Sequence, residues 1–439
     1  MTDPVSGFFI APNILGGPGD NVPRRSDAEG GAPPGPSRPP AARAATPLTR
    51  RALLAGGLAF AAAPARARTG FAAWLAAFRQ SAARQGLSER TLSAALTGVA
   101  FLPDVVAHDS RQAEVARPLQ DYLASAVSDA RRKSGQKALT RFKPVLAQIE
   151  RRYGVEKELL TAIWGMESAY GSFRGSLPVF STLATLAFEG RRRAFFEAEL
   201  LAALRIVQAA HATPAQMRGS FAGAMGHTQF MPSTYQRHAQ DFDRSGHADI
   251  WGEDPTDALA STAQLLKAAG WRKGQPWAIE VLLPEGFDLA LTGRIFARPA
   301  RAWARLGVVP ASGGALPDHG PGALILPAGP NGPVFLIYDN FHVIKKYNYA
   351  DSYAIAVGHL SDRLAGGGPL RAGFPRNPWG MSTGERQALQ ARLTARGFDA
   401  GPPDGVIGEK GRAAIRAYER ARGLPVTGVP SRALLARLD

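Results

Sequence analysis

Residues 158–171 read ELLTAIWGMESAYG and place one carboxyl group on an apolar helix face. The pattern predicts a helix that is stopped by glycine at Gly171. Burial disfavours the charged form of a carboxyl group, so we expect a raised pKa for Glu167 and proton donation near neutrality. A helix-end glutamate whose charge reaches water explains this stretch equally well. The residues that share a face with Glu167, three or four apart, are Leu160, Ile163, Trp164 and Tyr170.

Residues 219–235, GSFAGAMGHTQFMPSTY, contain too many glycines for a stable helix and lack the alternation of a strand. Glycine at this density lets the backbone approach another group closely. Ser220, His227, Thr228 and Gln229 add the hydrogen-bonding groups that a sugar requires. The alternative is a long ordered loop without chemistry, which composition alone favours.

Three segments together resemble the lytic murein transglycosylase B family: WGMESAYG (164–171), the glycine-rich segment, and YNYADSYAIAVGHL (347–360). The resemblance extends from about Phe71 to Leu364. It implies a lysozyme-like catalytic domain that cleaves the MurNAc–GlcNAc glycan of peptidoglycan without water and leaves 1,6-anhydro ends, with Glu167 as the acid. The residues implied at the cleft are Ser220, Gln229, Tyr347, Asn348 and Tyr353. From the sequence, Tyr347 and Tyr353 are equally explained as core tyrosines.

Only Glu167 has a convincing setting, whereas ordinary glycosidases use two carboxyl groups. Glu189, Glu197 and Glu199 lie among arginines, where a solvated ion pair is the default. A single carboxyl group favours a transglycosylase in which Glu167 acts as both acid and base. The alternative functions are a hydrolytic muramidase and a wall-binding scaffold with an inactive catalytic domain.

Residues 241–250, DFDRSGHADI, begin like the calcium loop of an EF-hand. Gly252 stands where such a loop has its closing glutamate, and the resemblance implies that Asp257 replaces it. A structural calcium ion and a plain Asp/Gly surface turn are alternative interpretations, and no cofactor is expected to be required. The candidate ligands are Asp241, Asp243, Ser245, the backbone carbonyl of His247, and Asp257.

Helical patterns dominate the catalytic segment, so we expect a mainly α fold with a small β-sheet. Strand-like runs occur at 279–283, 323–326 and 333–338, and Asp339-Asn340 predicts a hairpin turn before Phe341.

After a glycine- and proline-rich linker at 366–380, residues 381–439 predict a small three-helix domain. Its pattern, LQARL followed by GF, DGVIG and AIRAYERARGL, resembles a peptidoglycan-binding module.

Residues 1–48 are rich in proline, glycine and alanine and are expected to be disordered. Residues 49–68 have the layout of a signal peptide, and their paired arginines suggest twin-arginine export. We therefore expect a periplasmic enzyme with its catalytic domain at 69–365 and no integral membrane segment after signal cleavage. Because the chain has no cysteine, disulfides and thiol catalysis are excluded and a lipid anchor is not expected.

The formal net charge of +16 over 439 residues implies attraction to a polyanion. No zinc-ligand spacing or RNP-like aromatic pattern accompanies it, so nucleic acid is not the expected partner. Arginine is spread along the whole chain, which fits the glycan strands of an anionic cell wall. An arginine-rich composition without functional meaning is the alternative.

Overall fold

The computed structural model describes residues 56–112, 118–375 and 378–438. The predicted disordered extension (1–48) and the first part of the predicted signal peptide (49–55) lie outside the described residues. Residues 56–68 of that predicted signal peptide belong to the first helix, α1 (Gly56–Arg84). Within the described ranges, no helix combines the length and the apolar character needed to cross a membrane.

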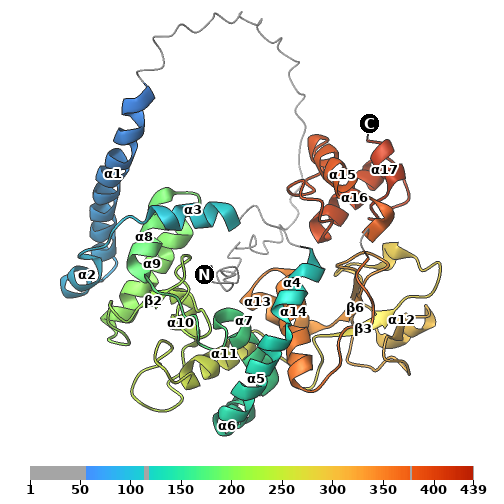
Figure 1. Ribbon diagram of the computed structural model, residues 1–439, viewed down its shortest axis with the longest axis horizontal. Coiled ribbons are helices and arrows are strands. Elements are labelled where there is room, and N and C mark those ends of the chain that lie inside the picture. The colour runs from blue at the N-terminus through green and yellow to red at the C-terminus, as the bar shows by residue number, and fades with distance from the viewer. Residues whose placement is uncertain (1–55, 113–117, 376–377, 439) are drawn as a thin grey trace, which may run out of the picture.

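Helices form most of the predicted catalytic domain (69–365), and α14 packs against α7, α4 and α5 at its centre (Figure 1). The mainly α fold is therefore confirmed. After α1, the helices of this part are α2 (Glu89–Leu96), α3 (Pro103–Gln112), α4 (Leu119–Ala126), α5 (Asp129–Arg141), α6 (Lys143–Tyr153), α7 (Lys157–Ser168), α8 (Val179–Glu189), α9 (Arg193–Gln208), α10 (Pro232–His238), α11 (Thr256–Ala268), α12 (Ala300–Arg305), α13 (Asp339–Tyr347) and α14 (Asp351–Leu364), with the 3-10 helix η2 (Leu289–Leu291). A further 3-10 helix, η3 (Pro378–Gly380), lies at the end of the predicted linker.

The strands form two small antiparallel sheets, and the larger one has the order β4-β3-β6-β5. The three strands predicted from the sequence are all present, with ends shifted by one residue or less. The strands are β1 (Leu177–Pro178), β2 (Arg218–Gly219), β3 (Ala278–Leu282), β4 (Val309–Pro310), β5 (Ala323–Ile325) and β6 (Val334–Ile337).

The predicted hairpin turn at Asp339-Asn340 is wrong, because α13 begins at Asp339. The Asn340 amide nitrogen donates to the carbonyls of Arg272 and Gln275, which ties the start of the helix to the loop before β3. Asp339 lies in the first turn, where a negative charge is favourable. These two polar residues therefore start a helix, and Tyr347 is the last residue of that helix.

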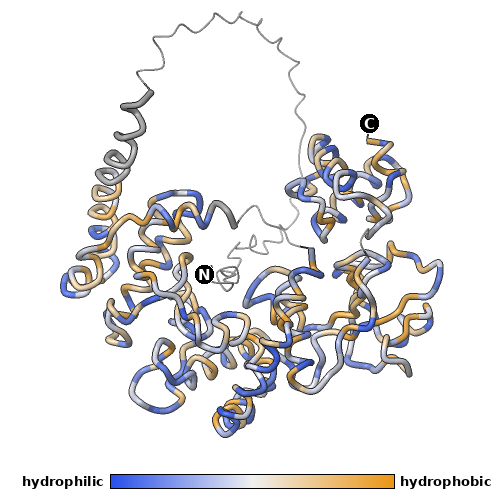
Figure 2. The backbone as a smooth tube through the Cα atoms, viewed as in Figure 1, coloured by the Kyte–Doolittle hydropathy of each residue, from blue (hydrophilic) through white to orange (hydrophobic). Residues whose placement is uncertain are grey.

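Apolar side chains divide into a large helical core and two smaller clusters. Figure 2 shows apolar and polar residues interspersed along the helices, as expected where one face of each helix is buried. The helical core includes Leu160 and Ile163 of α7 and Ile355 of α14, all fully buried. The helix that carries Glu167 therefore lies at the centre of the molecule rather than on its surface.

The C-terminal domain has its own apolar core and is docked on the sheet region. Arg412, which is buried, donates from Nη2 to the Thr292 hydroxyl at 2.7 Å and to the Leu289 carbonyl at 3.2 Å. In the linker, the backbone N–H groups of Arg371 and Ala372 donate to the Glu280 carboxylate. The helices of this domain are α15 (Thr383–Ala395), α16 (Glu409–Ala421) and α17 (Arg432–Ala436).

Candidate active site

The helix that bears Glu167 ends earlier than predicted, at Ser168 rather than next to Gly171. Ala169 and Tyr170 both adopt left-handed backbone conformations, with φ of 48° and 60°. This conformation is uncommon for residues other than glycine, so the surrounding contacts must hold it. The Tyr170 ring returns to cover Gly165, where an added Cβ would lie 2.5 Å from the ring. Tyr170 thus contacts α7 without belonging to it.

Glu167 is buried, with 5% of its surface exposed. The Tyr353 hydroxyl on α14 donates a hydrogen bond of 2.5 Å to its Oε1. Burial raises the pKa of Glu167 to about 8, and the bond from Tyr353 opposes this rise. The carboxyl group is therefore neutral at pH 7 and carries a proton that it can donate. The alternative, a helix-end glutamate in water, does not describe this residue.

Tyrosines from two further helices surround the acid. Tyr347 stacks on Tyr353, with ring centroids 6.4 Å apart and planes inclined by 7°, and its hydroxyl donates to the Thr228 carbonyl. Tyr122 of α4 has a buried hydroxyl with no hydrogen-bond partner among the described residues. Burial raises the pKa of all three tyrosines, and the charge of Glu167 raises each further. Tyr122 was not predicted at this site, because nothing in the local sequence pattern around it links α4 to α7.

The glycine-rich segment is buried and approaches other backbone closely, as its composition predicts. A Cβ on Gly219 would lie 2.3 Å from the Ala224 carbonyl oxygen, and one on Gly226 would lie 2.2 Å from the Ile250 carbonyl oxygen. Met225 forms isolated bridges to Gly219 and to Phe230. Glycine is therefore required at 219 and 226 because no side chain fits there.

The remaining predicted cleft residues, Ser220, Gln229 and Asn348, are all buried. Gln229 directly follows Thr228, the partner of Tyr347, and its amide nitrogen donates to the carbonyls of Arg174 and Gly226. The Ser220 hydroxyl accepts bonds from the backbone within its own segment. Asn348 follows Tyr347, and its Nδ2 has no partner within the described residues. The structure thus links Tyr353 to Glu167 directly, whereas Ser220 has no such contact.

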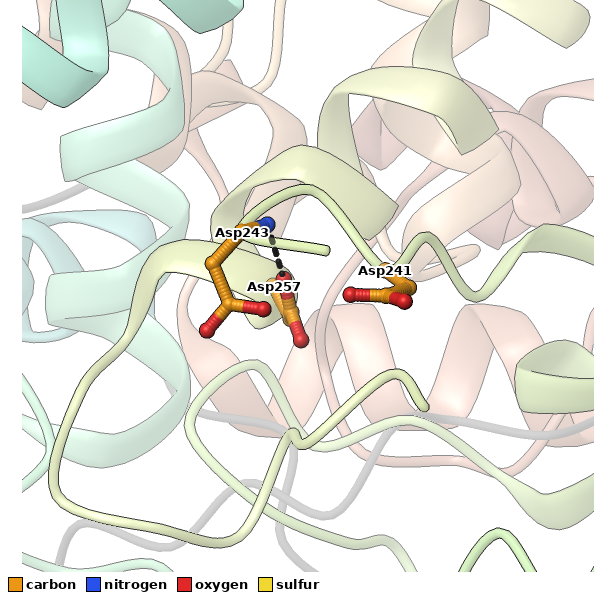
Figure 3. A group of neighbouring side chains, drawn as sticks. All are labelled: Asp241, Asp243 and Asp257. Atoms are coloured by element: carbon orange, nitrogen blue, oxygen red, sulfur yellow. Dashed lines mark hydrogen bonds between the residues drawn. The ribbon is translucent and has the colours of Figure 1, made fainter. Parts of the chain in front are cut away.

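Three predicted metal ligands converge in space. Asp241, Asp243 and Asp257 place carboxylate oxygens within 4.8 Å of one another (Figure 3). Asp257 is buried and also accepts backbone bonds from Phe242 and Asp249, so it closes the loop from the start of α11. Like charges this close repel one another unless a cation lies between them.

The other two predicted ligands lie in the same loop, where the backbone N–H of Ser245 donates to the carboxylates of Asp241 and Asp243. The Ser245 hydroxyl donates to the His247 carbonyl at 3.2 Å. Both oxygens belong to the same loop as Asp241 and Asp243. The donor set is thus carboxylate, hydroxyl and carbonyl oxygen, which is the set that Ca²⁺ takes in proteins. The residues present therefore fit this ion.

This helical architecture, with the buried carboxyl group of Glu167 at its centre, is typical of the lysozyme-like fold class. The chain belongs to the transglycosylase SLT domain family, whose model matches residues 70–362. A second model, described as a putative peptidoglycan binding domain, matches residues 382–438. Both parts of the resemblance are therefore confirmed.

The chain is also similar to one curated relative and to two solved structures. It is 36% identical over 220 residues to membrane-bound lytic murein transglycosylase B of Escherichia coli K12, which corresponds to 48% of this chain and 58% of that protein. The chain thus spans less than two thirds of the length of this curated relative.

Among solved structures, SltB3 from Pseudomonas aeruginosa is 46% identical with a TM-score of 0.76, over 84% of this chain and 99% of that one. It was solved with NAG-NAM-pentapeptide and with NAG-anhNAM-pentapeptide. SLT35 of Escherichia coli, solved in complex with calcium, is 29% identical with a TM-score of 0.57, over 66% of this chain and 92% of that one.

The raised pKa of Glu167 predicts a pH-dependent stability difference for Glu167→Gln. The folded protein holds this proton up to pH about 8, whereas the unfolded chain releases it near pH 4.5. Between these values the folded state binds more protons, so wild-type stability falls as pH rises. Glutamine has no proton to release. We expect the variant to melt several degrees above wild type at pH 9, with the gap closing toward pH 5, in calorimetry across this range.

Glu285→Gln, which changes an exposed carboxyl group, is the matched control. A difference in melting temperature between Glu167→Gln and wild type that stays constant from pH 5 to pH 9 would contradict the raised pKa of Glu167.

Proposed function

We propose that this protein is a lytic transglycosylase that cleaves the MurNAc–GlcNAc β-1,4 bond of peptidoglycan without water, with Glu167 as its single acid and base. The observation that carries the proposal is the neutral carboxyl group of Glu167, buried on α7 and bonded to Tyr353. An acid with a pKa near the working pH is suited to protonating a leaving group and then accepting a proton.

The first step breaks the glycosidic bond. Glu167 donates its proton to the bridging oxygen while the bond from C1 of MurNAc to that oxygen breaks, so the leaving sugar departs with a hydroxyl group. The C1 centre gains positive charge, and Glu167 becomes a carboxylate. The Tyr353 hydroxyl, already directed at Oε1, stabilises that carboxylate.

The second step closes the anhydro ring. The C6 hydroxyl oxygen of the same MurNAc bonds to C1, and Glu167 accepts the hydroxyl proton. The acid thereby returns to its starting form, and no water is consumed. The NAG-anhNAM-pentapeptide bound in the SltB3 structure supports this product class.

We propose that Tyr347, Asn348, Gln229 and Ser220 bind the glycan around this acid. Asn348 is suited to donating to a sugar oxygen, because its buried Nδ2 has no partner among the described residues. Tyr347 presents a ring beside Tyr353, and apolar sugar faces pack well on such rings.

A hydrolytic muramidase is the second candidate, because it would use the same acid. It needs a positioned water and normally a second carboxylate. In the described part of the chain, no second carboxylate is among the groups that shift the pKa of Glu167. This observation favours the transglycosylase over the muramidase. A wall-binding scaffold is disfavoured because the acid and its tyrosine partner are both in place.

We also propose an extracytoplasmic site of action. Peptidoglycan lies outside the cytoplasmic membrane, and the match of residues 382–438 to a peptidoglycan-binding model supports a wall-bound enzyme. Residues 49–68 would serve as the export signal, and the periplasm is the expected destination. Docking of the C-terminal domain through Arg412 would hold the wall-binding part at a fixed distance from the acid.

Finally, we propose that the aspartate loop holds a structural calcium ion. Asp241, Asp243 and Asp257 would supply carboxylate oxygens, with the Ser245 hydroxyl and the His247 carbonyl beside them. A bound cation would offset the repulsion among the three carboxylates. SLT35 was solved in complex with calcium, which supports the same ion here.

Calcium should raise the melting temperature by a few degrees, because an ion that binds only the folded state stabilises it. Asp257→Asn removes one charged ligand and should abolish most of that rise. Scanning calorimetry with calcium, with magnesium and with a chelator makes the comparison. An identical melting temperature in calcium and chelator would leave the loop as a plain turn.

Glu167→Gln should leave the fold and glycan binding intact and reduce cleavage of purified peptidoglycan by roughly a hundredfold to ten-thousandfold, the range that general acid catalysis contributes. Mass spectrometry of the wild-type products should show anhydro-MurNAc ends, which are one water lighter than reducing ends. Reducing ends would identify a hydrolase. If the variant keeps more than a few per cent of wild-type activity, another residue is the catalytic acid.

A further inference from the structure

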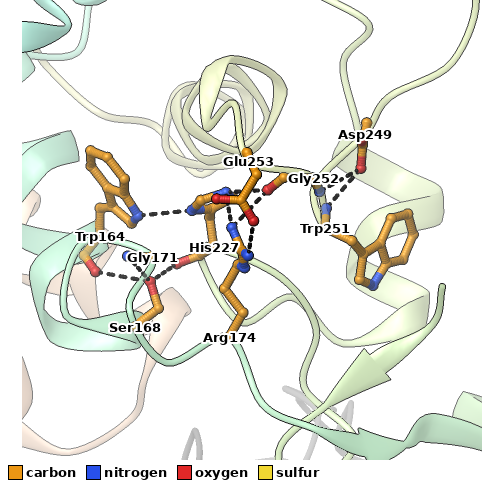
Figure 4. Close-up of polar contacts among 9 residues, drawn as sticks. All are labelled: Trp164, Ser168, Gly171, Arg174, His227, Asp249, Trp251, Gly252 and Glu253. Atoms are coloured by element: carbon orange, nitrogen blue, oxygen red, sulfur yellow. Dashed lines mark hydrogen bonds and ion pairs between the residues drawn. The ribbon is translucent and has the colours of Figure 1, made fainter.

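His227 of the glycine-rich segment contacts Trp164 and Ser168 of α7 (Figure 4), which lie before and after Glu167 in the sequence. Its Nδ1 accepts a bond of 3.2 Å from the indole N–H of Trp164, one turn before the acid. Its backbone carbonyl accepts a bond of 2.5 Å from the hydroxyl of Ser168, the residue after the acid. His227 is therefore bonded to α7 one turn before Glu167 and directly after it.

The same side chain reaches the loop at 249–253. Its Nε2 lies 2.8 Å from the Gly252 carbonyl oxygen, and its backbone N–H donates to the Ile250 carbonyl. Arg174 also donates to the Gly252 carbonyl and pairs with Glu253. The imidazole is thus a bridge between α7 and this loop, with a hydrogen bond on each side.

The partners fix the protonation state of the bridge. An indole N–H can only donate, so Nδ1 of His227 must be the unprotonated acceptor. The Gly252 carbonyl, 2.8 Å from Nε2, can only accept, so Nε2 carries the proton. The Arg174 guanidinium, 3.3 Å from Nε2, can only donate and is directed at the same carbonyl instead, at 2.8 Å. Burial lowers the pKa of His227, in agreement with a neutral ring. A different side chain cannot satisfy both partners unless it offers an acceptor and a donor at these two points.

Close packing leaves the imidazole one place to lie. A Cβ on Gly171 would lie 2.6 Å from Nδ1 of His227, so the glycine after the acid-bearing helix leaves room for the ring. On the other side, the Asp249 carboxylate accepts the backbone N–H groups of Trp251 and Gly252. Asp249 therefore fixes the carbonyl on which the bridge rests.

We infer that His227 is a positioning residue for the acid: its imidazole ties Trp164 to the loop fixed by Asp249 and so sets the place of Glu167 against the glycosidic oxygen. This inference rests on the proposed transglycosylase function. Proton transfer requires hydrogen-bond distance between acid and oxygen, so a displacement of α7 lowers turnover even when the substrate still binds.

Two substitutions each remove one of the two hydrogen bonds of the imidazole, to Trp164 or to Gly252. His227→Gln places an amide N–H near the position of Nε2 and keeps the Gly252 partner, but it loses the acceptor for Trp164. His227→Asn keeps an acceptor near Nδ1 but is too short to reach Gly252. With soluble GlcNAc–MurNAc oligosaccharides, we expect kcat to fall roughly tenfold in both, the order that one positioned hydrogen bond supplies, while KM stays within about twofold.

Asp249→Ala completes a double-mutant cycle. The substitution removes the carboxylate that fixes Gly252, the partner of His227 Nε2. We therefore expect it to lower kcat when introduced alone and to cause no further loss in combination with His227→Gln. The matched control is His238→Gln on α10, a histidine outside the tie, which should keep wild-type kcat. All rates are measured well below each variant's melting temperature and per folded molecule.

The outcomes separate cleanly. Wild-type kcat in both His227 variants, even with lower melting temperatures, would show a purely structural histidine and overturn the inference. Additive losses for His227→Gln and Asp249→Ala would overturn it as well. If the His227 variants do not fold, Trp164→Phe removes the indole donor with the imidazole intact, and unchanged kcat there has the same meaning. Absence of cleavage by wild type and His238→Gln would instead contradict the proposed function.

Discussion

The burial of one carboxyl group on α7 is the constraint on which the rest of the site depends. Without water around it, Glu167 keeps its proton at neutral pH, with a pKa near 8. In the proposed mechanism Glu167 acts first as an acid and then as a base, and full burial without a hydrogen-bond partner would oppose its ionisation too strongly. The Tyr353 hydroxyl supplies that partner, because it already donates to Oε1 of Glu167 and would stabilise the carboxylate formed in the proposed first step.

Elements far apart in the sequence converge to build this environment. Helices α13 and α14 bring Tyr347 and Tyr353, α4 brings Tyr122, and the glycine-rich segment brings Thr228 and His227. The segment reaches them because its glycines allow backbone-to-backbone contact. The same segment joins the acid-bearing helix to the loop before α11. Asp257, in the first turn of α11, accepts a hydrogen bond from Asp249 of that loop. Glu167 and its tyrosines, the glycine-rich segment and the aspartate loop thus form one connected region.

Local patterns in the sequence predicted the helix of Glu167, the three longest strands and the oxygen-rich loop, because each depends on neighbouring residues. They failed where distant contacts decide. Asp339-Asn340 looks like a turn, but Arg272 and Gln275 bind Asn340 and start a helix there. Gly171 looks like the stop of α7, but the helix ends at Ser168, where Ala169 and Tyr170 take left-handed conformations. Tyr122 carries no local signal, and only the packing of α4 places it near the acid.

The neutrality of the Glu167 carboxyl group at physiological pH can be tested by observing its ionisation directly. Carboxyl-labelled glutamate, followed by carbon NMR and assigned through the loss of one signal in Glu167→Gln, gives the titration curve of this group. We predict a midpoint far above 4.5, near 8, that moves higher in Tyr353→Phe because the hydroxyl bond is lost. A midpoint between 4 and 5 would mean a charged carboxylate at neutral pH and would contradict the account of the acid.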